Sequence, residues 1–278
     1  MSDILPPLIR AVEQADSAQR LLQAVHQLAD TRHEGAIPTL ITVLGYNNPG
    51  AAVAAVDGLV SIGEPSVPAL LEQLDQHNYT ARSWAIRALA GIGDPRSLVT
   101  LLGAATADFS LSVRRAATRG LGAMKWCWFP EQLLPIAQEE AMEALLFVAQ
   151  QDEEWVVRYA AIVGLQSLAI EVTATHPDWR LQMLAQFEQQ MVQDEAWAVR
   201  ARACMAWKAV QNPSFRSSSP PPCDRPDEAT SPLSATDWQN ILDKLYERKQ
   251  QERAVFTEGD PRRYKDLAVA VAQPTVST

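Results

Sequence analysis

Small and apolar residues recur along this chain with the spacing of a helix that buries one face. In one stretch, Val113, Ala116, Ala117 and Leu121 lie at positions i, i+3, i+4 and i+8. This stretch, of the form Val-Arg-x-x-Ala, returns at intervals of about 30 residues and later of about 40 residues. Clear copies occupy 113–121, 156–165 and 198–204, and weaker copies occupy 18–22, 50–59 and 81–91. The regular return of one helical pattern predicts a repeat protein.

A second helix follows the patterned helix in most of these units. The stretches 68–74 and 98–102 are apolar and come after turns that contain glycine or proline, such as 91–96. Glycine and proline are typical of the place where one helix ends and the chain turns. Stacked helix pairs of this kind predict an all-α fold, a HEAT-like α-solenoid of about five to six helical repeats.

The composition changes after residue 212, where serine and proline become frequent and predict a mobile linker. Beyond the linker, Ser234 to Asp237 resembles a helix-capping signal, and Trp238 and Ile241 begin an apolar stripe. This pattern predicts one amphipathic helix at about 235–253 in an otherwise flexible C-terminal extension. The resulting boundaries are a repeat domain at 1–212, a linker at 213–233 and a tail at 234–278.

Aspartates stand six positions before three of the repeated arginines. The pairs are Asp108 with Arg114, Asp152 with Arg158, and Asp194 with Arg200. A carboxylate in a turn can pair along the stack with a guanidinium in the first turn of a helix, and it can also accept hydrogen bonds from the turn backbone. We therefore expect a structural ladder of ion pairs, and we expect these arginines not to be catalytic.

Charge and apolar content exclude several classes of function. The chain has 278 residues, with 24 lysines and arginines against 33 aspartates and glutamates, and a net charge of -9. Such an acidic protein is not expected to bind nucleic acid or an anionic membrane. No apolar run approaches the roughly 20 residues that span a bilayer, and the first residues lack the regions of a signal peptide. We therefore expect no transmembrane segment and a cytoplasmic protein.

The sequence contains no motif of a common catalytic or metal site. Cys127, Cys204 and Cys223 are widely separated, and neither they nor the histidines have metal-ligand spacing. Their odd number argues against a disulfide framework and agrees with a reducing compartment. A phosphate-binding glycine loop and a nucleophile elbow are also missing from the sequence, so any chemistry has to be unusual or shared with a partner.

Three stretches contain more than a generic helical repeat needs. They are 78–96, which begins Asn-Tyr-Thr-Ala-Arg-Ser-Trp-Ala, 106–117, and 155–161 together with His-Pro-Asp-Trp at 176–179. We expect the Asn-Tyr-x-Ala-Arg-x-Trp-Ala and His-Pro-Asp-Trp elements not to be required by helix packing. In order and spacing, residues of about 17 to 211 resemble the phycobilisome lyase family, and within it the F-type subunit of heterodimeric phycocyanobilin lyases.

This resemblance implies a reaction and partners. It implies a cyanobacterial lyase subunit, active as a heterodimer with an E-type subunit, that joins phycocyanobilin through a thioether to one cysteine of the phycocyanin α subunit. Phycocyanobilin is then the substrate, and no prosthetic group is implied. The place of action is the cyanobacterial cytosol, near the phycobilisomes that serve photosynthesis.

Two departures from the family pattern affect the expected chemistry. A sister branch that also isomerises the bilin has an adjacent His-Cys pair in its F-type subunit, and this sequence has no such pair, which disfavours isomerisation. The tail after about residue 213 is not part of the F-subunit pattern, and its role stays open.

Three arginines are candidates for holding the bilin, whose two propionates need cations and whose rings need aromatic or apolar walls. Aligned repeats place Arg87 and Arg119 at the same position of successive units, and Arg115 lies one turn before Arg119. Tyr79 and Tyr159 could face the same surface. The alternatives are a solvated helix face for the arginines and packing against a neighbouring repeat for the tyrosines.

The remaining candidates lie in loops and turns. Trp126 and Trp128 flank Cys127, and an exposed aromatic loop suits a bilin or a partner, whereas tryptophans that anchor a long insertion fit the pattern equally well. Asp108 and Asp152 are candidates for catalytic protonation of the bilin, which competes with their ladder role.

Two other classes of function remain open. One is a non-enzymatic HEAT-repeat scaffold in phycobilisome assembly or degradation, and the other is a protein that removes bilin instead of attaching it. A scaffold binds phycocyanin without free bilin, whereas a lyase subunit binds bilin or an E-type partner.

Overall fold

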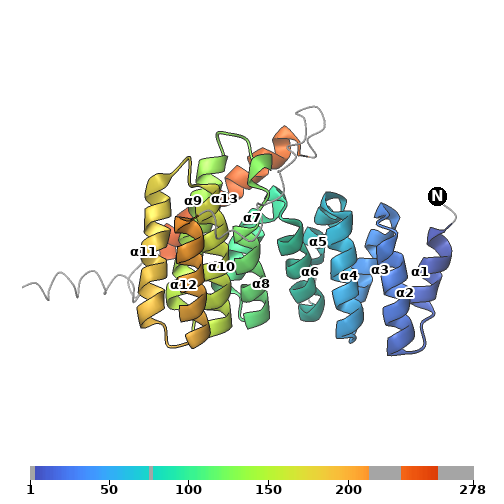
Figure 1. Ribbon diagram of the computed structural model, residues 1–278. Helices are drawn as coiled ribbons and strands as arrows, with labels where there is room; N and C mark the ends of the chain where they lie inside the picture. The colour runs from blue at the N-terminus through green and yellow to red at the C-terminus, as the bar shows by residue number, and fades with distance from the viewer. Residues whose placement is uncertain (1–3, 75–77, 213–232, 256–278) are drawn as a thin grey trace, which may run out of the picture. The chain divides into compact units, whose positions relative to one another are not determined.

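The computed structural model describes residues 4–74, 78–212 and 233–255, and the regular secondary structure of these residues is helical (Figure 1). Between Leu5 and Gln211, α-helices alternate between two sets. The odd-numbered helices are α1 (Leu5–Glu13), α3 (Ile37–Leu44), α5 (Val67–Leu74), α7 (Leu98–Ala107), α9 (Leu134–Gln151) and α11 (Pro177–Gln193). The even-numbered helices are α2 (Ala18–Asp30), α4 (Pro49–Ile62), α6 (Tyr79–Ile92), α8 (Leu111–Gly122), α10 (Trp155–Glu171) and α12 (Trp197–Gln211).

Each odd-numbered helix packs on the even-numbered helix that follows it, which gives six helix pairs between α1 and α12. The even-numbered helices also contact one another from pair to pair, and Figure 1 shows them side by side from α2 to α12. Buried small and branched residues such as Ala85, Leu89, Ala117 and Leu121 fill the space within and between pairs. The prediction of an all-helical solenoid of five to six HEAT-like repeats is confirmed.

Short-range polar contacts determine where several helices begin. The side chains of Ser17, Asn48 and Asn78 accept hydrogen bonds from backbone N–H groups in the first turns of α2, α4 and α6. These N–H groups have no partner within their own helix, so each cap removes an unpaired donor. Single 3-10 turns precede four odd-numbered helices, at Glu34–Ala36, Glu64–Ser66, Pro95–Ser97 and Trp126–Trp128.

Glycine is required at two kinds of position in the array. Gly93 ends α6 with φ 68°, in the left-handed region that side chains disfavour. Gly122 of α8 lies directly against the backbone of Gly164 in α10, and a Cβ atom on Gly122 would overlap it. The two glycines therefore allow a close approach between the neighbouring helices α8 and α10.

The C-terminal region contains one further helix, α13 (Ala235–Val255). Residues Met1–Pro232 and Leu233–Thr278 form separate compact units, and α13 belongs to the second. At its start, the Ser234 N–H donates to Asp237 Oδ2 at 2.8 Å and the Asp237 N–H donates to Ser234 Oγ at 3.2 Å. This reciprocal cap confirms the predicted capping signal. The predicted linker lies outside the described residues up to residue 232.

The length and hydropathy of the described helices decide whether any of them could cross a membrane. No single helix among them is long and apolar enough to cross a membrane. The bent pair formed by Pro49–Ile62 and Glu64–Leu74 is long and apolar enough only when its two helices are taken together, and it meets only the criteria of length and composition.

Candidate functional site

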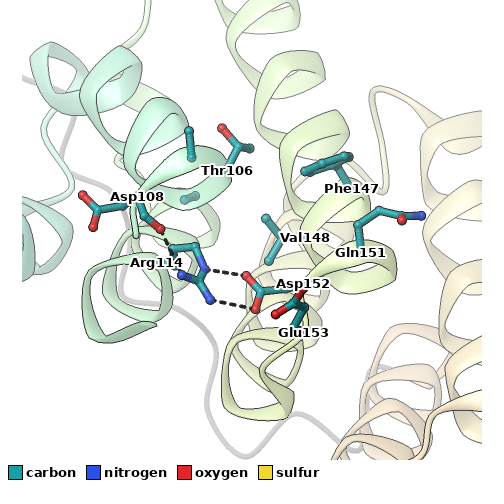
Figure 2. A pocket seen from close by; sticks show the side chains of 10 residues that line it. Thr106, Asp108, Arg114, Phe147, Val148, Gln151, Asp152 and Glu153 are labelled. Atoms are coloured by element: carbon teal, nitrogen blue, oxygen red, sulfur yellow. Dashed lines mark hydrogen bonds and ion pairs between the residues drawn. The ribbon is translucent and has the colours of Figure 1, made fainter. Parts of the chain in front are cut away.

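An arginine at the start of α8 joins two neighbouring helix pairs (Figure 2). Arg114 donates from Nε to Asp152 Oδ2 at 2.7 Å and from Nη2 to Asp152 Oδ1 at 3.1 Å. Its Nη1 donates to the carbonyl oxygens of Asp108, at 2.9 Å, and Phe109, at 3.2 Å, in its own turn. The hydrogen bond to Asp152 is the main cause that raises the pKa of Arg114 above its ordinary value. The guanidinium therefore stays charged and fixes the turn before α8 to the turn before α10.

The same contact recurs in the pairs before and after. Arg158 donates to both oxygens of Asp194, at 2.7 and 3.0 Å, and the pKa of Arg158 is raised mainly by this bond. Arg82 reaches Asp108 at 2.7 Å. Each of these three arginines thus pairs with the aspartate of the following unit. Arg114 and Arg158 do not pair with the carboxylate of the aspartate six positions before them, but they donate to its backbone carbonyl oxygen. A ladder of ion pairs is therefore present, but its pairs are shifted by one unit from the predicted ones, and Arg200 forms no ion pair with a described residue. We call these contacts the arginine ladder.

The candidate acids Asp108 and Asp152 are both members of the arginine ladder. Their side chains are 1% and 7% exposed, and each faces a guanidinium at 2.7 Å. Asp108 and Asp152 also accept backbone N–H bonds from Ser110 and Glu154, at 2.8 and 2.9 Å. Both carboxylates therefore hold a guanidinium and a turn backbone N–H at once, which is the ladder role expected from the sequence.

Two shallow pockets lie beside the arginine ladder. One, of about 300 Å³, is lined by Asp108, Arg114, Phe147, Gln151 and Asp152 among others, several of which Figure 2 labels. The other, of about 360 Å³, is lined mainly by glutamines and carboxylates of the next unit. Both volumes are at the low end for ligand pockets. Neither pocket is lined by the predicted propionate-binding arginines Arg87, Arg115 and Arg119.

The three predicted bilin-binding arginines lie outside the arginine ladder. Arg87 on α6 and Arg115 and Arg119 on α8 are exposed, and within the described residues none of them makes an ion pair. Arg87 lies over the Trp84 ring, 5.5 Å from its centroid. A Cβ atom on Gly120 would lie 2.5 Å from Ala90 Cβ, so α6 and α8 are packed tightly at the ends that carry these arginines. The structure thus places exposed cations on adjacent helices.

Tyr159 on α10 lies next to a further arginine. The Tyr159 side chain is 37% exposed. Burial lowers the pKa of Arg202 on α12, while the nearby Tyr159 partly opposes this. Arg202 Nη2 donates to Gln166 Oε1 at 2.7 Å and thereby links α12 to α10. Sequence reasoning missed Arg202 because the equivalent positions in α8 and α10 hold the small residues Ala116 and Ala160.

Tyr79 lies at the start of α6, away from Arg87. It is the first residue of α6, is 66% exposed, and contacts Phe109 edge to face with ring centroids 5.5 Å apart. Arg87 is eight positions later, about 12 Å along the helix axis at 1.5 Å per residue. The structure therefore places Tyr79 with Phe109, at the edge of the array where the even-numbered helices begin and the arginine ladder lies.

The aromatic loop before α9 is anchored to the core on one side. Trp126 is 4% exposed and packs on Phe129 with ring centroids 5.5 Å apart, which supports the anchoring alternative for this residue. Trp128 is half-buried, with Lys125 Nζ 4.0 Å from its ring centroid. Cys204, on α12, is a free cysteine.

The two sequence elements that were expected to exceed packing needs have structural roles. Asn78 caps α6 and Arg82 of the same element belongs to the arginine ladder. His176 precedes α11 and stacks on Trp179, with ring centroids 3.9 Å apart and an interplanar angle of 20°. Asn78, Arg82, His176 and Trp179 therefore contribute to helix starts and to local or inter-repeat contacts.

Comparisons with known proteins place this chain among bilin lyase subunits. A HEAT-repeat family model matches residues 67–166. The chain is 59% identical over 281 residues to "Phycocyanobilin lyase subunit beta" of Pseudanabaena tenuis (strain PCC 7409), covering 98% of this chain and 99% of the relative. It is 52% identical over 192 residues to "Phycocyanin alpha phycocyanobilin lyase CpcF" of Synechocystis sp., covering 69% of this chain and 87% of the relative.

A solved structure agrees with this placement. A chain of the complex of CpcE and CpcF of phycocyanin lyase from Nostoc sp. PCC7120 has 48% sequence identity and a TM-score of 0.57, and the match covers 63% of this chain and 99% of that chain. Because a relative with 59% identity matches over 98% of this chain and 99% of its own length, this chain belongs to the CpcF-like family of phycocyanobilin lyase subunits.

Proposed function

We propose that this chain is the F-type subunit of a heterodimeric lyase, which attaches phycocyanobilin through a thioether to a cysteine of the phycocyanin α subunit. Its family membership supports the activity. The complex of CpcE and CpcF in Nostoc supports an E-type partner, and the Synechocystis relative's name supports the phycocyanin α subunit as acceptor. The proposed place of action is the cytosol of a cyanobacterium, where phycobilisomes are assembled.

One observation carries the assignment of the bilin site. Arg82, Arg114 and Arg158 are engaged in the arginine ladder, whereas Arg87, Arg115 and Arg119 are exposed and make no ion pair with a described residue. Exposed cations on adjacent helices of an acidic protein suit a ligand with two carboxylates, because guanidinium groups bind carboxylates in two-pronged geometry. We therefore assign the bilin propionates to these three arginines.

The neighbouring helix supplies the other contacts that a tetrapyrrole needs. Tyr159 presents an aromatic ring and a hydroxyl group, and Arg202 with Gln166 forms a polar link between α10 and α12. Val163 takes the position on α10 that Arg119 takes on α8, and it adds apolar surface. The bilin rings would thus extend from the arginines of α6 and α8 toward α10. Trp128 stays a candidate wall, and Trp126 does not belong to this surface because it is buried.

The chemistry requires no nucleophile from this chain. The acceptor thiolate adds to the ethylidene carbon of the bilin, a C–S bond forms, and a proton is taken up at the adjacent ring carbon, so that no redox partner is needed. The contribution of the lyase is to hold the bilin in one orientation against the acceptor cysteine, which lowers the entropic part of the barrier. Such a role explains why the sequence contains no catalytic motif.

Omission of single components tests this proposal. The chain is coexpressed with an E-type subunit, the apo-phycocyanin α subunit and the enzymes of phycocyanobilin synthesis. The product is scored by zinc-enhanced fluorescence on denaturing gels and by absorption in acid urea. We expect a covalent adduct only when both lyase subunits are present. If phycocyanin binds but no adduct forms, the protein is a scaffold, and if preformed adduct loses its bilin, it is a removal protein.

A further inference from the structure

Within the described helices of the repeat array, α12 is the last, and no further helix pair follows it on the side where each preceding even-numbered helix has one. In α6, α8 and α10, the residue four positions after the ladder arginine is buried. These residues are Ile86, Thr118 and Ile162, which are 1%, 0% and 0% exposed. Thr118 illustrates why, because its carbonyl oxygen lies against Gly164 of the following helix, 3.0 Å from the site of a Cβ atom there. The equivalent residue of α12, Cys204, is only half-buried. The side of α12 that faces along the array is therefore incompletely covered.

The arginine ladder is open at the same place. Arg200 is the next arginine in the series, but no aspartate or glutamate within the described residues forms an ion pair with it. Its Nε donates instead to the Met191 carbonyl at 3.1 Å, and its guanidinium lies 4.7 Å from the centroid of the Trp197 ring. Trp197 is 79% exposed. Each of the three preceding arginines takes its carboxylate from the turn of the next helix pair, so Arg200 lacks the carboxylate that a further pair would supply.

We propose that this incompletely covered side of α12 is the docking surface for a helix pair of the E-type subunit. The inter-helix turn of that pair would bring an aspartate or glutamate to Arg200. This inference rests on the proposed function, which supplies the heterodimer. Ala201 and Cys204 offer small side chains for close helix packing, and Lys208 adds a second positive charge. We call Trp197, Arg200, Ala201, Cys204 and Lys208 the α12 end face.

The repeat register and the charge determine the kind of partner. The α12 end face carries two cations in a chain of net charge -9, so it favours an acidic turn on the other side. A second copy of this chain could bring Asp16, from the turn before α2, to the same place. Such a head-to-tail contact does not close on itself and would build open filaments, whereas a heterodimer uses the surface once.

Binding between the purified full-length chain and a purified E-type subunit tests the inference. Arg200→Gln removes the guanidinium, and Ala201→Arg places a large side chain where a helix has to pack. We expect Arg200→Gln to weaken binding by about 30-fold or more, as truncation of a desolvated charge pair does. Ala201→Arg should also weaken binding, because its large side chain prevents close helix packing. Trp197→Ala is compared with Trp155→Ala, which changes the equivalent position of α10. Only Trp197→Ala should weaken binding, because only Trp197 belongs to the α12 end face. Isothermal calorimetry gives the dissociation constants, and thermal melts of each variant show that it folds.

Controls distinguish this inference from the proposed function. Arg20→Gln and Ser167→Arg change exposed residues of α2 and α10, and we expect both variants to bind as the parent chain does. If the parent chain fails to bind the E-type subunit, the proposed function is contradicted. If it binds and the Arg200 and Ala201 variants bind equally well, only the docking surface is overturned. Filaments of the chain alone that vanish with Arg200→Gln would also overturn it, because they would assign the surface to a second copy.

Discussion

Arg114 and Asp152 are 38 positions apart in the chain and joined by two hydrogen bonds in the structure. The bonds connect the start of α8 with the turn before α10, so one ion pair sets the distance between two repeats. The same guanidinium binds the Asp108 carbonyl, and Asp152 accepts the Glu154 N–H. The contact thus serves turn geometry and repeat stacking at once.

Removing Arg114 should destabilise the array. Arg114→Ala leaves the Asp152 carboxylate, 7% exposed, without its cation, and loss of one partner from a buried pair costs about 3 kcal/mol of unfolding free energy. Urea unfolding followed by circular dichroism measures this loss. Arg20→Ala is the matched control, because Arg20 pairs with Asp16 on the surface, where both side chains are more than half exposed, and we expect a change below about 0.5 kcal/mol. Equal losses for the two variants would contradict the structural role of the arginine ladder.

Substitution of Asp152 separates its ladder role from catalysis. Asp152→Asn keeps an acceptor for the Glu154 N–H but loses the charge opposite Arg114. We expect lower stability and an unchanged attachment rate per folded molecule, measured well below the melting temperature. General acid catalysis contributes about 100-fold or more to a rate, so a loss of that size in folded protein would show that Asp152 protonates the bilin.

The contact between α8 and α10 should not tolerate a methyl group. Gly122→Ala places a Cβ atom against the backbone of Gly164, and overpacking of this kind costs about 1–3 kcal/mol. Gly103→Ala on α7 is the matched control, because nothing lies within 4 Å of its Cβ position. Alanine also favours helix over glycine, so the control should gain about 0.5–1 kcal/mol. Opposite shifts of the urea midpoint are expected, and a gain for both variants would mean that α8 and α10 are less tightly packed.

The cap of α6 should contribute measurable stability. The Asn78 side chain accepts from the N–H groups of Thr80 and Ala81, each at 3.1 Å. Asn78→Ala removes both bonds and should lower the unfolding free energy by about 1 kcal/mol, while Asn78→Asp should retain most of it. Thermal melts of the two variants measure the difference, and equal melting temperatures would mean that the cap is dispensable.

The repeated arrangement could be predicted from the sequence because the same spacing of residues recurs from one repeat to the next. The spacing of Val113, Ala117 and Leu121 predicted a buried helix face, and all three residues are fully or nearly fully buried. The recurrence of aspartate before arginine predicted the arginine ladder. The direction of the pairing could not be predicted, because the sequence gives the spacing within a unit and not the offset between units.

The rest of the candidate site depends on contacts that no local pattern encodes. Trp126 and Trp128 are two positions apart, yet one is buried on Phe129 and the other only half-buried near Lys125. Arg202 occurs in only one repeat, so no recurrence pointed to it, although it connects α12 with Gln166 of α10. Both cases involve a single side chain whose surroundings are built by residues distant in the sequence.

The most direct test of the account is the rate at which the heterodimer forms the thioether when its exposed arginines are neutralised. In the purified complex with apo-phycocyanin α subunit and phycocyanobilin, Arg115→Gln and Arg119→Gln together should lower the initial rate at least about tenfold, since a charge-assisted hydrogen bond contributes about 1.5–3 kcal/mol. Arg20→Gln should leave the rate unchanged, and binding of the E-type subunit should be equal in all three proteins. An unchanged rate for the Arg115 and Arg119 double variant would contradict the assignment of the bilin to this face.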